Sequence, residues 1–132
     1  MSFASQDIQV IFNDGNFPEF VRRLKRLGIL AYEYNNEIGE FTFFGADGHQ
    51  EVMPSNGLTL NPVDKVNPEA VQTAVKKFQS GATEFSQFAK EAAELGIYTW
   101  QVNLEKLDVE FFNHKGDLVY REVFASVFDW YC

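Results

Sequence analysis

Histidine and cysteine, the side chains most often used for acid–base and nucleophilic chemistry near neutral pH, are few among the 132 residues of this chain. The two histidines, His49 and His114, each lie beside a predicted turn, without the close His, Cys or carboxylate neighbours that a metal site requires. We interpret them as solvated turn residues rather than as ligands or acid–base groups. The single cysteine, Cys132, has no basic neighbour in the sequence that would activate its thiol. With no nucleophile elbow and no phosphate-binding glycine loop present, we predict no catalytic residue, no metal ligand and no cofactor, and an enzyme is the least favoured class.

Carboxylates on predicted strands are a second candidate for chemistry. Glu33, Asp108 and Glu110 fall on the face opposite the aromatic side chains. Paired carboxylates can exchange protons with a substrate or bind a cation. A chain with a formal net charge of −8 also places such groups readily on a solvated sheet face, and this is the interpretation that we favour.

A basic run and an apolar tail form a candidate interaction surface. Arg22, Arg23, Lys25 and Arg26 lie on the outer face of a predicted helix, where they either contact an acidic partner or are simply solvated. No aromatic residue is interleaved with this run, and a net negative chain is repelled by phosphate, so we do not expect nucleic acid as a partner. Residues 126–132 are strongly apolar and could support self-association. The residues assigned to this surface are Arg22, Arg23, Arg26, Trp130 and Tyr131.

Aromatic residues at strand spacing have two interpretations. They could line an apolar ligand cleft between two halves of the molecule, or they could form its packed core, which is the default for such a stripe. The residues assigned to the candidate cleft are Tyr32, Tyr34, Phe43, Trp100 and Phe111.

Composition restricts the class of protein further. Apolar residues make up 45% of the chain and aromatic residues 16%, which is enough for a hydrophobic core. No stretch approaches the roughly 20 apolar residues that span a bilayer, and the N-terminus lacks a signal-peptide pattern, so we expect a soluble cytoplasmic protein without membrane contact. The expected partner is an unknown protein or a second copy of the chain, as in a homodimer.

An internal repeat organises the elements that carry these residues. Residues 16–52 align without a gap on residues 84–120, an offset of 68, with ten identical positions. The shared Leu-Gly-Ile falls where a helix should end, the shared Phe-Phe falls in a strand, and a shared glycine falls in a turn. These positions are the ones that build a fold, so we interpret the chain as a tandem duplication.

Capping residues and apolar spacing predict two helices and three strands in each copy. In the first copy the predicted helices cover 7–13 and 17–27, and Asn16 caps the second of them. In the second copy one helix starts at Pro68, after the cap Asn67. The other helix of the second copy covers 85–95, after the cap Thr83. The predicted strands are 29–35, 40–45, 50–53, 97–104, 107–113 and 118–124.

Alternation along the strands predicts one apolar and one mostly polar sheet face. The apolar face is expected to carry Leu30, Tyr32, Tyr34, Tyr98, Trp100 and Val102. Such a sheet needs helices on one side only. We therefore predict an α+β two-layer sandwich, a tandem duplication of an ααβββ unit with an antiparallel sheet. It is a single domain, 1–132, with repeats at about 5–53 and 67–124, a linker at 54–66 and a tail at 126–132.

Three stretches of the chain resemble a family of uncharacterised bacterial and prophage-encoded proteins, the YdfO/YbcV-like proteins, sometimes labelled "phage envelope protein". They are the helix-to-strand stretch 17–34, the run Phe-Thr-Phe-Phe-Gly-Ala-Asp-Gly at 41–48, and the second-half stretch 67–88. The resemblance implies a two-layer α+β fold and no established activity. We predict a non-catalytic interaction or structural protein of unknown function; the alternative is a small-molecule binding module that uses the cleft between the repeats.

Overall fold

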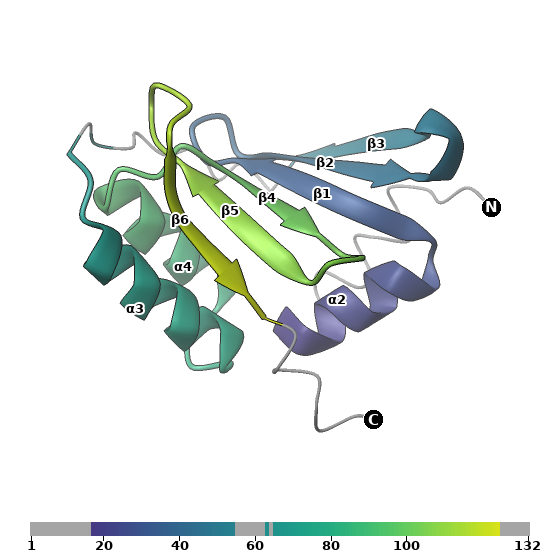
Figure 1. The fold of residues 1–132 in the computed structure, drawn as a ribbon, viewed down its shortest axis with the longest axis horizontal. Helices are drawn as coiled ribbons and strands as arrows, with labels where there is room; N and C mark the ends of the chain where they lie inside the picture. The colour runs from purple at the N-terminus through teal and green to yellow at the C-terminus, as the bar shows by residue number, and fades with distance from the viewer. Residues whose placement is uncertain (1–16, 55–62, 64, 125–132) are drawn as a thin grey trace.

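The structure, a computed structural model, describes residues 17–54, 63 and 65–124. These residues form three α-helices, a short 3-10 helix and six strands (Figure 1). In chain order they are α2 (Phe17–Arg26), β1 (Ile29–Asn35), β2 (Glu40–Gly45), η1 (Ala46–Gly48), β3 (Gln50–Pro54), α3 (Pro68–Gln79), α4 (Phe85–Glu94), β4 (Thr99–Asn103), β5 (Asp108–Phe112) and β6 (Leu118–Val123). The expected α+β class is confirmed, and each predicted strand lies within two residues of an observed one.

All six strands belong to one antiparallel sheet, in the order β3-β2-β1-β4-β5-β6. Each half of the chain contributes three consecutive strands, and the two sets meet where β1 lies beside β4 (Figure 1). At this seam Tyr34 lies opposite Trp100, and Glu33 lies opposite Gln101, 68 positions later in the chain.

Backbone hydrogen bonds beside the seam occur in corresponding places of the two halves. The Asn36 amide donates to the carbonyl of Tyr98 at 2.7 Å, and the Leu104 amide donates to the carbonyl of Leu30 at 2.9 Å. Leu104 follows Asn36 by the offset of the sequence repeat, and Tyr98 follows Leu30 by the same offset. The two halves therefore contribute equivalent backbone positions to the centre of the sheet.

The helix starts agree with the capping analysis in one case and correct it in another. Asn67 caps α3, because its side-chain oxygen accepts from the amide of Ala70 at 3.2 Å, and Pro68 is the first helical residue. Thr83 was the predicted cap of α4, but the capping position belongs to Glu84, whose side chain makes no capping bond. Asn16 and the predicted helix 7–13 lie outside the described residues.

The hydrophobic core lies between the helices and one face of the sheet. Phe20 of α2 packs against Tyr32 with ring centroids 5.8 Å apart, and Phe85 of α4 packs against Tyr34 at 5.0 Å. Val75 of α3 belongs to the same buried cluster. Burial of the Tyr32 phenol raises its pKa, because the charged form would lose its hydration.

Leu30 departs from the predicted alternation. It was expected on the apolar face, but 38% of its surface is exposed, whereas Ile29 is buried. The pairing of β1 with β2 shifts register between Ile29 and Ala31. Such a bulge adds one residue on one strand and turns the following side chains to the other face, so strict period-two counting fails at this position.

Candidate functional site

The face of the sheet opposite the core, here called the open face, carries most of the polar strand residues. Cross-strand pairing arranges the side chains of this face, polar and apolar, in rows that run from β2 to β6. One row contains Thr42, Glu33, Gln101, Glu110 and Arg121, and the next contains Phe44, Ala31, Asn103, Asp108 and Val123. Because directly opposed residues lie within about 5.5 Å of each other, each row is a line of neighbouring side chains.

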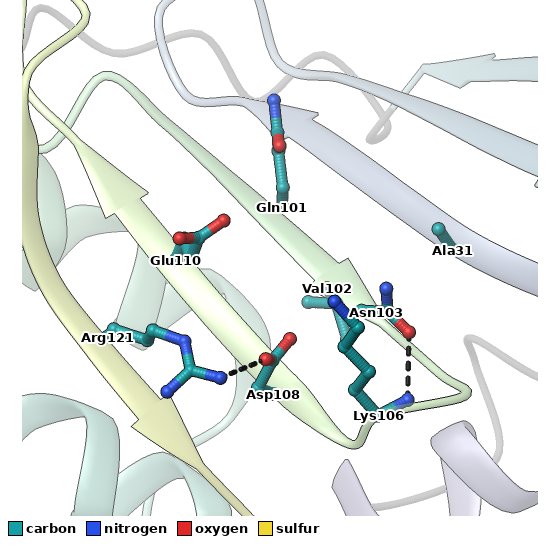
Figure 2. A pocket seen from close by; sticks show the side chains of 8 residues that line it. All are labelled: Ala31, Gln101, Val102, Asn103, Lys106, Asp108, Glu110 and Arg121. Carbon is teal, nitrogen blue, oxygen red and sulfur yellow. Dashed lines mark hydrogen bonds and ion pairs between the residues drawn. The ribbon is translucent and has the colours of Figure 1, made fainter.

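A pocket of about 210 Å³ opens on this face over β4, β5 and β6 (Figure 2). Figure 2 shows Arg121 reaching across from β6 to Asp108, and Lys106 extending from the β4–β5 turn, with Glu110 and Gln101 further along the strands. The lining residues are Ala31, Gln101, Val102, Asn103, Lys106, Asp108, Glu110 and Arg121.

Two local features create the space for this pocket. Ala31 has only a methyl side chain at the point where β1 lies opposite Asn103. The Asn103 side chain is held by the β4–β5 turn, because its oxygen accepts from the amides of Glu105 and Lys106, each at 2.9 Å. This Asx turn keeps the Asn103 oxygen engaged with the turn and away from the middle of the pocket.

An ion pair forms one wall of the pocket. Arg121 Nη2 donates to Asp108 Oδ2 at 2.5 Å. Asp108 is buried, with 10% of its side chain exposed, whereas 48% of the Arg121 side chain is exposed. A carboxylate at that depth needs a partner to replace its hydration, and Arg121 supplies it.

Lys106 and Glu110 supply one further charge of each sign. Within the described part of the chain, no hydrogen bond or ion pair engages the Lys106 ammonium or the Glu110 carboxylate. The pocket therefore offers an unengaged cation and an unengaged anion beside an ion pair that is already formed. Such a set can recognise charged groups, but it includes no histidine, cysteine or hydroxyl nucleophile.

Sequence reasoning located part of this site. Glu33, Asp108 and Glu110 do share one face, and Asp108 and Glu110 line the pocket. Lys106 and Arg121 were missed. A basic residue in β6, the third of three consecutive antiparallel strands, was a usable signal, because such a residue could lie opposite Glu110. The local sequence does not specify the strand register, however, and the register decides that Arg121 is the residue opposite Glu110.

The basic run on α2 is partly engaged by an acidic neighbour. Arg22 and Arg23 lie 2.9 Å and 3.1 Å from the two carboxylate oxygens of Glu19. Arg26 is exposed at the end of the helix. Residues 126–132, with Trp130 and Tyr131, lie outside the described residues, so the apolar part of the predicted surface stays a prediction.

The five aromatic residues assigned to a ligand cleft lie in the core. Each has at most 4% of its surface exposed, and neighbouring rings fill the space between the halves, as Tyr34 and Trp100 do with centroids 4.9 Å apart. These positions favour the core interpretation over the cleft interpretation. The five are Tyr32, Tyr34, Phe43, Trp100 and Phe111.

The histidines lie away from the pocket lining. His49 Nε2 is 3.9 Å from a carboxylate oxygen of Glu51, and the His114 ring lies 4.7 Å from that of Tyr98. Within the part of the chain that the structure places, no three His, Cys, Asp or Glu side chains converge as metal ligands would. No helix among the described residues has the length and apolar character needed to cross a membrane.

Comparison with known proteins found one family. A family model described as "Protein of unknown function (DUF1398)" matches residues 7–123, which include every element of the sheet. No curated protein matches the chain.

Proposed function

The chain belongs to the DUF1398 family of proteins of unknown function, and we propose that it is a non-catalytic protein-interaction domain that binds a basic polypeptide on its open face. The observation that carries this proposal is the arrangement of the sheet. Residues of the described helices share a buried cluster with one face of the sheet, and the other face presents rows of polar and apolar side chains with a pocket among them. A broad sheet face offers the extended area that a polypeptide partner needs.

The edges of the sheet are poorer binding surfaces than its open face. β3 has five residues and ends at Pro54, which lacks a backbone donor. β6 carries the charged side chain of Arg121 in its middle. Short length, proline and charge are devices that protect edge strands from pairing with another chain. These features argue against strand addition as the mode of binding.

The charges on the open face indicate the kind of partner that it would bind. Glu33 and Glu40 lie on the open face outside the pocket, and Glu110 lies within it. The Asp108 carboxylate is paired with Arg121, and among the described residues that line the pocket only Lys106 is a cation without an ion-pair partner. The whole chain has a net charge of −8. An acidic face on an acidic chain attracts a basic segment and repels a second copy.

The test uses a defined basic peptide, tetralysine, with the ¹⁵N-labelled full-length chain. We expect tetralysine to shift the amide resonances of β1, β2 and β4, and tetraglutamate to leave them unchanged. Glu33→Lys and Glu40→Lys should each weaken tetralysine binding about tenfold, because each replaces an attraction with a repulsion. Glu94→Lys on α4 makes the same change of net charge away from the open face and is the control.

Two results would contradict this proposal. If Glu94→Lys weakened binding as much as Glu33→Lys, the attraction would come from net charge alone. If tetralysine shifted only helical amides, the open face would not be the binding surface.

We also propose that the finer predictions from the sequence hold for this family member: two copies of an ααβββ unit, arranged in two layers, in a cytoplasmic protein related to the YdfO/YbcV-like group. The pairing of Glu33 with Gln101 supports the duplication, because each residue lies opposite its own counterpart in the other half. Gly28 and Gly96 support it too, since both end a helix at the same φ of 87°.

A further inference from the structure

We propose that the pocket on the open face is a binding site for a small zwitterion, a molecule with one ammonium and one carboxylate group, such as a free amino acid. This inference goes beyond the interaction proposed above and does not require it. It rests on the charges in the pocket and on its size.

The pocket accommodates a small molecule only. At about 210 Å³ it lies below the 300–1,000 Å³ that is usual for sites of drug-sized ligands. Since a water molecule occupies about 30 Å³ of liquid, the pocket has room for roughly seven non-hydrogen atoms. Simple amino acids have this size.

The charges in the pocket match both ends of a zwitterion. A ligand carboxylate can bind the Lys106 ammonium, whereas Arg121 lies on the far side of Asp108 and stays paired with it (Figure 2). A ligand ammonium can bind the Glu110 carboxylate, which no described residue engages. The ion pair of Arg121 with Asp108 fixes one wall of the pocket, so this wall loses little side-chain freedom on binding.

A ligand with a single charge is a poorer match. An anion that approached Lys106 and Arg121 would be repelled by Glu110 and Asp108, and a cation that approached the carboxylates would be repelled by the two basic groups. A zwitterion satisfies both sets at once. Because the pocket carries positive and negative side chains, it favours a ligand that carries a positive and a negative group.

The repeated architecture does not require a charge at the positions of Lys106 and Glu110. The position 68 residues before Lys106 is Ile38, in the corresponding turn, and the position 68 residues before Glu110 is Thr42. Val52 lies opposite Thr42 as Arg121 lies opposite Glu110. The first half thus forms the same three-stranded arrangement without a charge at either of these two positions, so a requirement of the fold does not account for Lys106 and Glu110.

The test is a titration of the ¹⁵N-labelled full-length chain, followed by amide chemical shifts. The probes are γ-aminobutyrate and glycine, which carry both charges, and butyrate and butylammonium, which carry one each. We expect the zwitterions to shift the amides of residues 101–110 and 121 in a saturable way, with at least one of them binding about tenfold more tightly than either singly charged probe. Equal binding of butyrate would mean an adventitious ion only and would overturn the proposal, as would the absence of saturable shifts.

Substitutions in the pocket sharpen the test. Lys106→Met and Glu110→Gln should each weaken the preferred zwitterion about tenfold, since each removes one charge-assisted contact. Lys90→Met and Glu94→Gln, both on α4, are the matched controls and should leave the affinity unchanged. An unchanged amide spectrum away from the pocket shows that each variant is folded. If neither pocket variant altered the affinity, the pocket would not be the site.

The outcomes for the two proposals are separable. Tetralysine binding is measured through Glu33→Lys and Glu40→Lys, which lie outside the pocket lining, whereas zwitterion binding is measured through Lys106→Met. Loss of one interaction with retention of the other would reject only the corresponding proposal.

Discussion

Gly96 follows α4 in a conformation that only glycine adopts easily, with a φ of +87°. A Cβ atom at this position would lie 2.6 Å from the carbonyl oxygen of Lys65 and 3.0 Å from the Val66 side chain. Gly81, which follows α3, has a similar φ of +85°, but nothing lies within 4 Å of its hypothetical Cβ. Comparing substitutions at the two glycines therefore separates the cost of backbone strain, present at both, from the cost of close contact, present at Gly96 only.

Gly96→Ala is expected to destabilise the fold more than Gly81→Ala. The left-handed conformation costs a non-glycine residue about 1–2 kcal/mol in either variant. At Gly96 the clash with Lys65 adds about 1–3 kcal/mol, in the range of overpacked core positions. Urea unfolding followed by circular dichroism measures both changes. Equal losses in the two variants would show that the segment at 65–66 moves aside without cost.

The pairing of β5 with β6 depends on a carboxylate that is nearly buried. Asp108 has 10% of its side chain exposed, and its ion pair with Arg121 joins the two strands. The ion pair between Lys77 and Glu91 is a useful comparison. Its cation is equally exposed, at 49%, but its carboxylate is more accessible, at 22%, and the distance is 3.4 Å.

Arg121→Met is expected to cost about 1–3 kcal/mol of unfolding free energy, because it leaves the Asp108 carboxylate without a partner at a depth where water replaces it poorly. Lys77→Met should cost at most about 1 kcal/mol, as is usual for surface ion pairs. Adding Asp108→Asn to Arg121→Met should recover part of the loss, since the buried charge is then removed. Denaturant titrations of these three variants and of Asp108→Asn alone test this. Additive effects of Arg121→Met and Asp108→Asn would mean that the two side chains are not coupled.

Across the molecule, the two halves share one core at the seam between β1 and β4. Trp100 has 3% of its surface exposed, and its ring contacts Tyr34 from the first half as well as Phe88 and Phe111 from the second. Neither half can bury these rings without the other. We therefore expect the described part of the chain to unfold as one cooperative unit.

Trp100→Ala is expected to lower the unfolding free energy by about 3–5 kcal/mol, and to lower the urea concentration at the unfolding midpoint equally for both halves. Phe112→Ala is the control, because Phe112 lies in β5 on the open face, is only half-buried and should cost about 1 kcal/mol. Amide peak intensities in increasing urea report residues 17–54 and 65–124 separately. Separate midpoints for the two halves would reject a shared core.

Much of the architecture could be predicted because its signals are local. The cap at Asn67, the helix stops at Gly28 and Gly96, and the two-residue period of the strands each depend on a few neighbouring residues. The prediction failed at Leu30, where a bulge interrupts the period, and at the start of α4, where Glu84 takes the capping position without a side-chain capping bond although Thr83 is the better capping residue type.

The candidate site was predictable only in part, because it is assembled across strands. The sequence alone placed Glu33, Asp108 and Glu110 on one face, since alternation along a strand is a local property. It could not place Arg121 beside Asp108, thirteen positions away, or Ala31 beside Asn103, because cross-strand register is decided by how the whole sheet packs on its helices. Local spacing thus established the elements and their faces, and long-range packing of the aromatic core established which charged side chains meet in the pocket.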